Sequence, residues 1–371
     1  MFSDIDRFHM ARAVELARQG EGTVEPNPMV GCVIARGAEA IAEGWHRQFG
    51  GPHAEIEALS MADGRAAGAT MYVTLEPCCH QGKTPPCTEA IIQAGIRRVV
   101  IAMRDPFPQV DGGGLKLLEA AGITTDVGLM ESEARELNRP YLKLVESGRP
   151  WVIAKWAMTL CGKTATRTGS SRWISGEKSR EVVHRLRGRV DAILVGSGTA
   201  RCDDPELTVR LPAGQVPKRV PLRIVLDSRA ELSLESRLVQ TASELPLLVA
   251  VSEEASGESI QRLEKAGAEV FCCRGSDRSA RLESLLDELG RRRMTNLLVE
   301  GGGEVVGTLL DVRAVDEVHV FIAPKLVGGK ASPTPAGALG IAQMSDALHV
   351  IRPTIETLDS DIYLHGRIGE K

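Results

Sequence analysis

Residues 74–91 of the chain read TLEPCCHQGKTPPCTEAI. Three cysteines, Cys78, Cys79 and Cys87, are crowded together here, and a proline directly precedes both Cys78 and Cys87. Eight cysteines in a chain of 371 residues do not suggest a disulfide framework. In a reducing compartment, clustered cysteines more often bind a metal or take part in catalysis. The stretch therefore predicts a metal site or a reactive thiol in a protein expected to be cytoplasmic.

The composition is that of a globular protein with ordinary surface charge. Hydrophobic residues make up 43% and charged residues 25%, and the formal net charge is -4. This balance does not indicate a nucleic-acid partner. No apolar run is long enough to cross a bilayer, and the N-terminal stretch lacks the basic and apolar blocks of a secretory signal.

Strand and helix signals alternate along the chain, with one clear interruption. A chain of this length exceeds the size at which single cores stop growing, so two domains are expected. Gly148 and Pro150 punctuate the sequence before a new apolar strand begins. We therefore predict two α/β domains, residues 1–147 and 148–371. Within the first, Pro140 predicts a break or kink in a long helical segment.

A histidine upstream completes a candidate set of zinc ligands with the cysteines. The segment GGPHAEIEAL places His53 in the first turn of an expected helix, and Cys87 also opens a helix. Two helix N-termini could thus present the His53 imidazole and the Cys78 and Cys87 thiolates to one zinc ion. Three protein ligands leave a position for water, whose pKa the metal lowers. Glu55, two residues after the histidine, is placed to take up and pass on a proton.

Other ligand sets remain open on spacing alone. A structural zinc site needs a fourth protein ligand, which Cys79 or His80 could supply. Adjacent cysteines rarely both reach one metal, and Cys78 is favoured because it follows the proline. A further alternative is that the cysteines bind no metal and are ordinary buried residues of the hydrophobic core.

The second half carries polar groups and glycines at expected strand ends. NLLVEGGGEVVGTLL is a strand, a glycine cluster and a helix, with Glu300 at the strand end. Such turns let a backbone approach phosphate, although a plain turn is the alternative reading. VDAILVGSGTARCDDPELTVR runs into a second glycine-rich turn that contains Thr199. A third strand ends in Asp227-Ser228-Arg229, where a hydroxyl and a guanidinium suit the 2′-phosphate of NADP. Together these three clusters favour a dinucleotide site.

These motifs resemble a known family. The His-x-Glu, Pro-Cys and later Cys pattern is that of zinc deaminases. PCCHQGKTPPC, PNPMVGCVI, KWAMTLCGKTAT, SRWIS, GSGTARCDDPELTVR and VEGGGEVVGTLL closely resemble the bifunctional deaminase/reductases of riboflavin biosynthesis. The resemblance implies a cytidine-deaminase-like α/β/α first domain and a dihydrofolate-reductase-like second domain. It implies one zinc ion on His53, Cys78 and Cys87, with Glu55 as proton shuttle, and NADPH in the second domain.

The resemblance also implies roles for further residues. In the first domain, Asn27 would contact the substrate, with a turn residue flanked by prolines as the alternative. His80 and Lys83, in the loop between the cysteines, could bind the phosphate or base edge of the substrate, with solvated loop residues as the alternative. In the second, the cofactor would be lined by Ala157, Trp173, Thr199, Asp203, Ser228, Gly302, Gly303, Glu304, Val305, Val306, Gly307 and Thr308, and the substrate would face Ser171, Arg187, Leu207, Arg210 and Glu300. Lys155 is expected to pair with Glu300 near the reacting carbon. The chain has Leu160-Cys161-Gly162 where the family usually has Leu-Asp-Gly, which predicts a slower reduction if that aspartate positions a ligand.

The reactions that the resemblance implies are consecutive. Zinc-assisted hydrolysis removes the ring amine of 2,5-diamino-6-ribosylamino-4(3H)-pyrimidinone 5′-phosphate, and NADPH then reduces the ribosyl group to a ribityl chain. A homo-oligomer without nucleic-acid or membrane partners is expected. Two alternatives are a nucleic-acid deaminase with an appended binding domain and a zinc-stabilised module with a nucleotide-sensing domain. The acidic balance counts against the first alternative.

Overall fold

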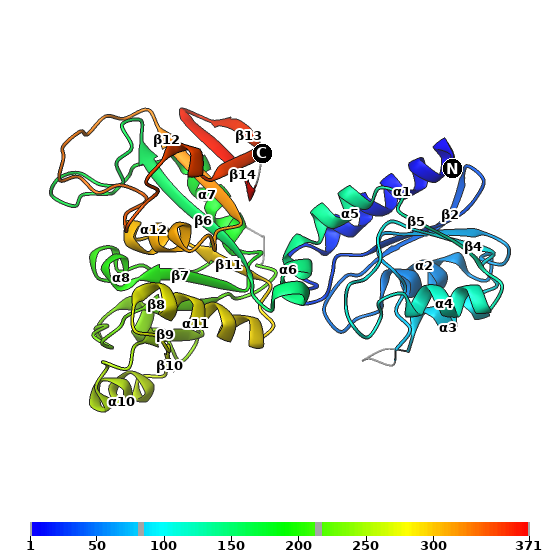
Figure 1. Ribbon diagram of the computed structural model, residues 1–371, viewed down its shortest axis with the longest axis horizontal. Coiled ribbons are helices and arrows are strands. Elements are labelled where there is room, and N and C mark those ends of the chain that lie inside the picture. The colour runs from blue at the N-terminus through cyan, green and yellow to red at the C-terminus, as the bar shows by residue number, and fades with distance from the viewer. Residues whose placement is uncertain (1, 81–84, 212–216, 370–371) are drawn as a thin grey trace. The chain divides into compact units, whose positions relative to one another are not determined.

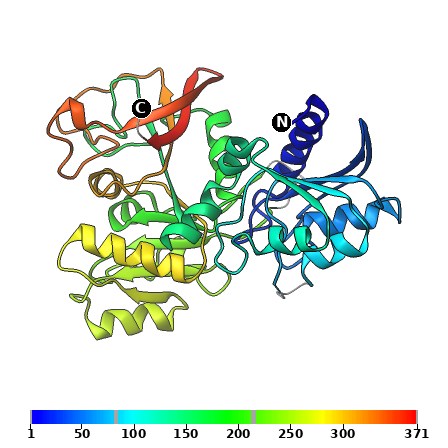
Figure 2. The ribbon, with the colours of Figure 1, turned by 45° about the vertical axis from the view of Figure 1, so that its right-hand side comes forward.

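The computed structural model describes residues 2–80, 85–211 and 217–369 of the chain. The chain forms two compact units, Met1–Gly148 and Arg149–Lys371. Each unit is a β-sheet with helices packed on both faces (Figures 1 and 2). Among the described residues, no helix is both long enough and apolar enough to span a membrane.

The described part of the first unit contains a five-stranded sheet in the order β2-β1-β3-β4-β5. β1 pairs antiparallel with β2 and with β3, whereas β3, β4 and β5 are parallel. β1 and β2 thus form an antiparallel hairpin. The strands are β1 (Gly31–Arg36), β2 (Glu39–Trp45), β3 (Thr70–Val73), β4 (Arg98–Ile101) and β5 (Thr124–Val127); the helices are α1 (Asp4–Ala17), η1 (Arg18–Gly20), α2 (Ala54–Ala62), α3 (Cys87–Gln93), α4 (Gly113–Ala120), α5 (Glu131–Leu137) and α6 (Arg139–Ser147).

Both faces of this sheet are buried, which makes the unit a three-layer α/β/α structure. Cys32 and Ile34 of β1 pack with residues of α2, α3 and α4 on one face. Val33 and Ala35 of the same strand pack with residues of α1, α5 and α6 on the other. Figure 1 shows these two helical layers on opposite sides of the sheet. The break predicted at Pro140 is present, because α5 ends at Leu137 and Pro140 lies in the first turn of α6.

A buried carboxylate anchors α1 to the sheet. Asp6 completes a capping box with Ser3, accepts a hydrogen bond from the Tyr72 hydroxyl at 2.9 Å, and pairs with Arg98 at 2.7 Å. Burial alone would raise the pKa of Asp6, but Arg98, Ser3 and Tyr72 outweigh it and lower this pKa below its ordinary value. A depressed folded-state pKa stabilises the fold above the unfolded value of about 3.9, and this stability is lost as the pH falls.

Replacing this carboxylate is expected to destabilise the first unit. Asp6→Ala leaves Arg98 and Tyr72 without their buried partner, which should lower the free energy of unfolding by about 3 kcal/mol. Urea denaturation at pH 7 measures this loss, and Asp4→Ala, at an exposed position of the same helix turn, is the control with an expected change below about 0.5 kcal/mol. Equal stabilities of the two variants would contradict the anchoring role.

The described part of the second unit contains a nine-stranded sheet in the order β10-β9-β8-β7-β11-β6-β12-β14-β13. Pairing is parallel from β10 through β12, and β14 and β13 add antiparallel strands at one edge. The strands are β6 (Trp151–Thr159), β7 (Ala192–Gly196), β8 (Leu222–Leu226), β9 (Leu247–Val251), β10 (Glu269–Cys272), β11 (Asn296–Val299), β12 (Glu317–Ala323), β13 (His349–Leu358) and β14 (Asp361–Gly369); the helices are α7 (Glu177–Arg187), α8 (Ser197–Asp203), α9 (Arg237–Gln240), α10 (Gly257–Lys265), α11 (Arg278–Arg291), α12 (Gly303–Asp311) and η2 (Met344–Asp346).

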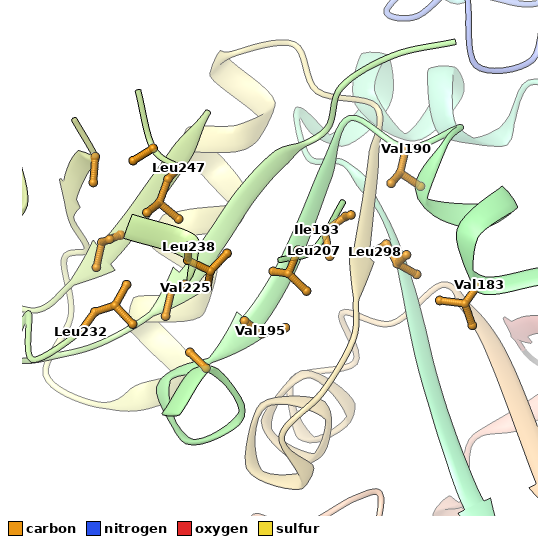
Figure 3. Packing of buried hydrophobic residues seen from close by; sticks show 14 of the residues in the cluster. Val183, Val190, Ile193, Val195, Leu207, Val225, Leu232, Leu238, Leu247 and Leu298 are labelled. Atoms are coloured by element: carbon orange, nitrogen blue, oxygen red, sulfur yellow. The ribbon is translucent and has the colours of Figure 1, made fainter. Parts of the chain in front are cut away.

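The apolar runs of this unit are buried on both sides, as is typical of parallel sheets. Ile193 and Val195 of β7 face a cluster that includes α7, α9 and α10 (Figure 3). Ala192 and Leu194 face the opposite cluster, which includes α11 and α12. Parallel strands end at the same edge of the sheet. The loops after β7, β8, β9, β10 and β11 therefore lie side by side, and they form the second site described below.

Two elements of this unit differ from the expected pattern. Residues 197–203 form the helix α8, where the sequence predicts a glycine-rich turn. Residues 349–358 form β13, which the sequence analysis does not predict as a strand. β13 is an edge strand with mostly exposed side chains, so it lacks the apolar pattern that identifies the buried strands.

Candidate functional site

The predicted metal ligands of the first unit lie together. The donor atoms of His53, Cys78 and Cys87 are all within 4.8 Å of one another. The His53 Nδ1 atom is 3.3 Å from the Cys87 sulfur and 3.5 Å from the Cys78 sulfur. His53 is the N-cap residue of α2, and Cys87 is the first residue of α3. Two helix N-termini thus converge on one point.

The protein holds one of the two sulfurs ready as a thiolate. The thiol and the backbone N–H of Cys87 donate toward Cys78, and with His53 they lower the pKa of Cys78 well below its ordinary value. The Cys78 thiolate together with burial raises the pKa of Cys87, and hydrogen bonding to Cys78 raises the pKa of His53. A metal that binds here therefore displaces the proton of the Cys87 thiol.

The donor set fits zinc. Zinc binds thiolates at about 2.3 Å and imidazole at about 2.0 Å, so tetrahedral ligand atoms lie roughly 3.5–4 Å apart. The three donors are already near that spacing without any rearrangement of their helices. Three ligands are the number found in catalytic rather than structural zinc sites.

Glu55 lies beside this cluster in the first turn of α2. Its side chain is buried, and burial raises its pKa to about 7, although the charge of His53 opposes the shift. A carboxyl group with a pKa near neutrality can both accept and give up a proton at physiological pH. The position and the protonation behaviour are those of a general acid and base.

The neighbouring predicted residues lie around the cluster rather than in it. The Cys79 thiol points to the carbonyl of Gln109 at 3.6 Å, and Cys79 is not one of the clustered donors. The Nδ1 atom of His80 is buried and has no hydrogen-bond partner among the described residues. This unsatisfied nitrogen is available to a ligand. Lys83 lies outside the described residues.

Asn27 is oriented by a histidine that the sequence analysis missed. His46 contacts the carbonyl of Pro52 through Nδ1 at 2.8 Å, and its Nε2 atom is 3.2 Å from the Asn27 amide nitrogen. Because Nδ1 donates to the carbonyl, Nε2 accepts from the amide, and burial keeps His46 neutral by lowering its pKa. The His46 ring also packs edge-on against His53, with ring centroids 5.4 Å apart. The segment GWHRQFGGPH places both histidines seven residues apart, but no local rule connects them.

Glu76 is a second residue that the sequence analysis missed. Its buried carboxylate accepts backbone hydrogen bonds from Asp105 at 3.4 Å, Gly112 at 3.2 Å and Leu115 at 3.2 Å. It therefore ties the segment before α4 to the strand end that leads to Cys78. This contact positions the ligand loop without belonging to the ligand set.

In the second unit, a charged triad lies at the end of β11. Arg187, the last residue of α7, binds Glu300 through two hydrogen bonds of 2.5 and 2.9 Å. Lys155 of β6 is 3.6 Å from the same carboxylate. Burial alone would raise the pKa of Glu300, but Arg187 and Lys155 hold this pKa at about 2. Burial lowers the pKa of Lys155, so its ammonium group gives up a proton more readily than a lysine in water.

Beside this triad, a pocket runs along the carboxyl ends of neighbouring strands. Its lining comes from the ends of β7, β8 and β9, from the segments after β8, β10 and β11, and from the first turns of α8, α11 and α12. The lining residues are Gly196, Ser197, Gly198, Thr199, Leu226, Ser228, Ala250, Val251, Cys273, Arg278, Arg281, Leu282, Gly302, Gly303, Glu304 and Val305. Gly301 and Gly302 have positive φ angles of 139° and 78°, a conformation that side chains disfavour. A Cβ atom on Gly198 would meet nothing within 4 Å, so this backbone faces open space.

The pocket fits a dinucleotide. The glycine-rich turn after β11 leads directly into α12, whose first backbone N–H groups have no partner within the helix and suit phosphate oxygens. Of the predicted cofactor residues, Thr199, Ser228, Gly302, Gly303, Glu304 and Val305 line it.

Other predicted residues of this unit lie outside the pocket lining. Asp203, at the end of α8, accepts from the Ser171 hydroxyl at 3.3 Å. The Trp173 ring is exposed, and Arg180 stacks on it at 4.5 Å. Arg210 is exposed and pairs with Glu206 at 3.6 Å.

The remaining predicted positions are packed into the unit. Val306 and Leu207 are buried core residues, and Ala157 packs against the core. Thr308 bonds back to the carbonyl of Glu304 at 2.7 Å. Gly307 allows close approach of residue 337, because a Cβ atom there would lie 2.2 Å from the Gly337 carbonyl oxygen.

Comparison with known proteins adds independent information. Residues 3–103 match the family described as the cytidine and deoxycytidylate deaminase zinc-binding region, and residues 150–364 match the RibD C-terminal domain. The riboflavin biosynthesis protein RibD of Actinobacillus pleuropneumoniae is 41% identical over 98% of this chain and 94% of its own length. The protein of the same name from Escherichia coli K12 is 40% identical over 97% of this chain and 98% of its own length.

Solved structures show the same similarity. RibD of Acinetobacter baumannii (form 1) superimposes with a TM-score of 0.87 at 34% identity, and 99% of each chain is covered. A diaminohydroxyphosphoribosylaminopyrimidine deaminase/5-amino-6-(5-phosphoribosylamino)uracil reductase from Thermotoga maritima gives a TM-score of 0.83 at 38% identity, with 98% of this chain and 99% of that chain covered. The deaminase-like first domain and reductase-like second domain expected from the sequence are confirmed.

Proposed function

This chain belongs to the RibD family of bifunctional riboflavin-biosynthesis enzymes, and we propose on that premise a specific assignment of its two active sites. Residues 1–147 deaminate 2,5-diamino-6-ribosylamino-4(3H)-pyrimidinone 5′-phosphate, and residues 148–371 reduce the ribosyl group of the product. The observation that carries the first assignment is the convergence of His53, Cys78 and Cys87 beside Glu55.

The deamination replaces a ring C–NH₂ group by C=O, with one water consumed and one ammonia released. Zinc held by His53, Cys78 and Cys87 supplies Lewis acidity that makes water nucleophilic at neutral pH. Glu55 accepts the proton from that water and delivers it to the leaving amine. Asn27, fixed by His46, and His80, with its unsatisfied Nδ1, hold the substrate. Lys83 is proposed for the same role from the sequence alone.

In the reduction, hydride adds to C1′ of the ribosyl group, the C1′–O bond of the sugar ring breaks, and the ring oxygen takes up a proton. NADPH in the pocket supplies the hydride. Lys155, held by Glu300, is the proposed proton donor, and burial favours this role because it lowers the pKa of Lys155. Arg187 fixes the orientation of Glu300, and Arg210, which is exposed and loosely paired, is proposed to bind the substrate phosphate.

The family assignment argues against the two alternative functions that the sequence leaves open. A nucleic-acid deaminase with an appended binding domain does not account for the match of residues 150–364 to the RibD C-terminal domain. A non-catalytic zinc module does not account for near full-length similarity to RibD proteins. We further propose a cytoplasmic homo-oligomer. The eight free cysteines support the reducing location.

The assignment is tested by following the two steps separately. With the diaminopyrimidine ribosyl phosphate as substrate, ammonia release is expected without NADPH. NADPH oxidation is expected only after ammonia has been released. Oxidation of NADPH that precedes ammonia release would contradict the proposed order, and a zinc-free sample that releases ammonia at the full rate would contradict the zinc assignment.

Cys161 offers a prediction because it stands where the sequence resemblance leads us to expect an aspartate. Its sulfur accepts backbone hydrogen bonds from Val327 at 3.3 Å and Gly328 at 3.4 Å and lies 3.2 Å from the Thr159 hydroxyl. These contacts, the Thr159 hydroxyl first, lower the pKa of Cys161 to about 7. A thiolate here can replace a carboxylate as the acceptor that holds the loop at residue 327.

We therefore expect Cys161→Asp to keep the reductase activity within about twofold, because the acceptor is retained. Cys161→Ala removes the acceptor that holds this loop and should lower kcat/KM of the reduction by roughly tenfold, the effect of about one lost charge-assisted hydrogen bond. Steady-state kinetics of reduction measure both variants. Equal behaviour of Cys161→Ala and the unaltered chain would show that this contact does not support the reduction.

A further inference from the structure

We propose that Arg281 recognises the 2′-phosphate of NADPH together with Ser228 and thereby sets the preference of the second unit for NADPH over NADH. This inference rests on the proposed reductase function. It replaces the role that the sequence suggests for Arg229, and it names the side chain that distinguishes the two dinucleotides.

The pocket has two chemically different ends. The end of β7 and the turn after β11 supply glycine backbone, and the turn after β11 leads into the first turn of α12, which suits the pyrophosphate shared by NADH and NADPH. The loops after β8 and β10 and the helix α11 instead supply side chains, namely the Ser228 hydroxyl and the Arg281 guanidinium. β7, β8, β9 and β10 are consecutive neighbours in the sheet. With about 4.8 Å between strands, this side-chain end extends beyond the glycine turns toward the adenosine half of a bound dinucleotide.

Arg281 is available to an anion. Its half-buried side chain lines the pocket from the first turns of α11. Within residues 2–80, 85–211 and 217–369, its guanidinium has no hydrogen bond or ion pair, and its electrostatic neighbour is the thiol of Cys273. A guanidinium that lines a pocket without a carboxylate partner matches the geometry of phosphate oxygens.

The acidic groups near this end of the pocket are already engaged. Asp227, at the end of β8, is buried and accepts the backbone N–H of Leu232 at 2.6 Å. It is also absent from the pocket lining given for the described residues, so it does not offer the carboxylate with which NAD-specific sites bind the ribose 2′-hydroxyl. Glu304 of α12 lines the pocket but is paired with Arg278 at 2.5 Å, a bridge that neutralises it and joins α11 to α12.

Arg229 is poorly placed for the same role. Its side chain is 69% exposed, lies 3.9 Å from Glu231, and is absent from the pocket lining given for the described residues. Its neighbour Ser228 does line the pocket. The sequence motif therefore identifies the correct strand end but supplies only the hydroxyl. The guanidinium comes from a helix more than fifty residues later in the sequence.

The test compares Arg281→Ala with the matched control Arg229→Ala by isothermal titration calorimetry with NADPH, NADH, 2′,5′-ADP and 5′-ADP. In Arg281→Ala, loss of a charge-assisted contact should weaken the binding of NADPH and of 2′,5′-ADP by about 10- to 100-fold. Binding of NADH and 5′-ADP should stay within about twofold. Arg281→Lys should recover part of the affinity for 2′,5′-ADP, because it restores the charge without the planar fork. Arg229→Ala should leave all four affinities unchanged.

Three results would overturn the inference. If Arg281→Ala weakens the binding of NADPH and NADH equally, Arg281 contacts the pyrophosphate. If it weakens the binding of neither, Arg281 does not contact the cofactor. If Arg229→Ala selectively weakens the binding of NADPH and 2′,5′-ADP, the 2′-phosphate is bound by Arg229, as the sequence motif suggests. In all three cases the unaltered chain still binds NADPH, and the proposed reductase function stands. If the unaltered chain binds neither dinucleotide, both the inference and the reductase assignment fail.

Discussion

Glu55→Gln is expected to lower ammonia release by roughly 10²- to 10⁴-fold, the range attributed to a positioned general acid and base. Glutamine keeps the shape of the buried side chain but can neither accept nor deliver the proton. The zinc content should stay at one per chain, because His53, Cys78 and Cys87 are unchanged. Ammonia release and metal analysis by mass spectrometry measure the two outcomes on the same sample.

Glu57→Gln is the matched control for this experiment. Glu57 lies two residues after Glu55 in the first turn of α2, and its carboxylate pairs with Arg47 at 3.2 Å. Its replacement should leave ammonia release within about twofold, since exposed ion pairs contribute little. Reduction of an already deaminated substrate should be unaffected in both variants. A Glu55→Gln chain that releases ammonia at the normal rate would remove Glu55 from the mechanism.

Lys155→Met is expected to lower the turnover number of the reduction by roughly 10²-fold or more, because it removes the proposed proton donor. Methionine has a similar length and tolerates burial, and the contact between Arg187 and Glu300 remains. The KM for NADPH should change less than about threefold, since Lys155 is not among the residues that line the pocket. Stopped-flow measurement of NADPH oxidation with the deaminated substrate separates the two parameters.

The control is Lys178→Met, which removes an exposed lysine that pairs with Asp359. It should leave both the turnover number and the KM unchanged. Deamination by Lys155→Met should also be unchanged. A normal turnover number in Lys155→Met would mean that the proton comes from another group. An equal drop of the turnover number in Lys155→Met and Lys178→Met would point to a general effect of removing a lysine.

The grouping of the three candidate ligands, His53, Cys78 and Cys87, was predictable because its determinants are local. Cys87 is the first residue of α3, and His53 caps α2, as the glycine, proline and helix signals around them indicate. By contrast, the partners of His46 and Glu76 are a distant amide and backbone N–H groups of a later loop. No local sequence pattern reports such contacts, because any of several polar residues could make them.

The second site was predictable only in outline for the same physical reason. Strand ends and glycine turns identify the edge of the sheet, and Ser228 and Gly302 do line the pocket. Which cation reaches that pocket depends on how α11 packs on the sheet. The choice between Arg229 and Arg281 is therefore a property of tertiary packing and not of the motif. The exposed edge strand β13 escaped detection because it carries no buried face.

The most direct test of two active sites in one chain is mass spectrometry of the product. The zinc-loaded protein is incubated with the diaminopyrimidine ribosyl phosphate and NADPH, and the product mass is measured. We predict a product in which one amine is replaced by oxygen and two hydrogens are added. A product that carries the two hydrogens while retaining the amine, or a substrate that stays unchanged, would contradict the account.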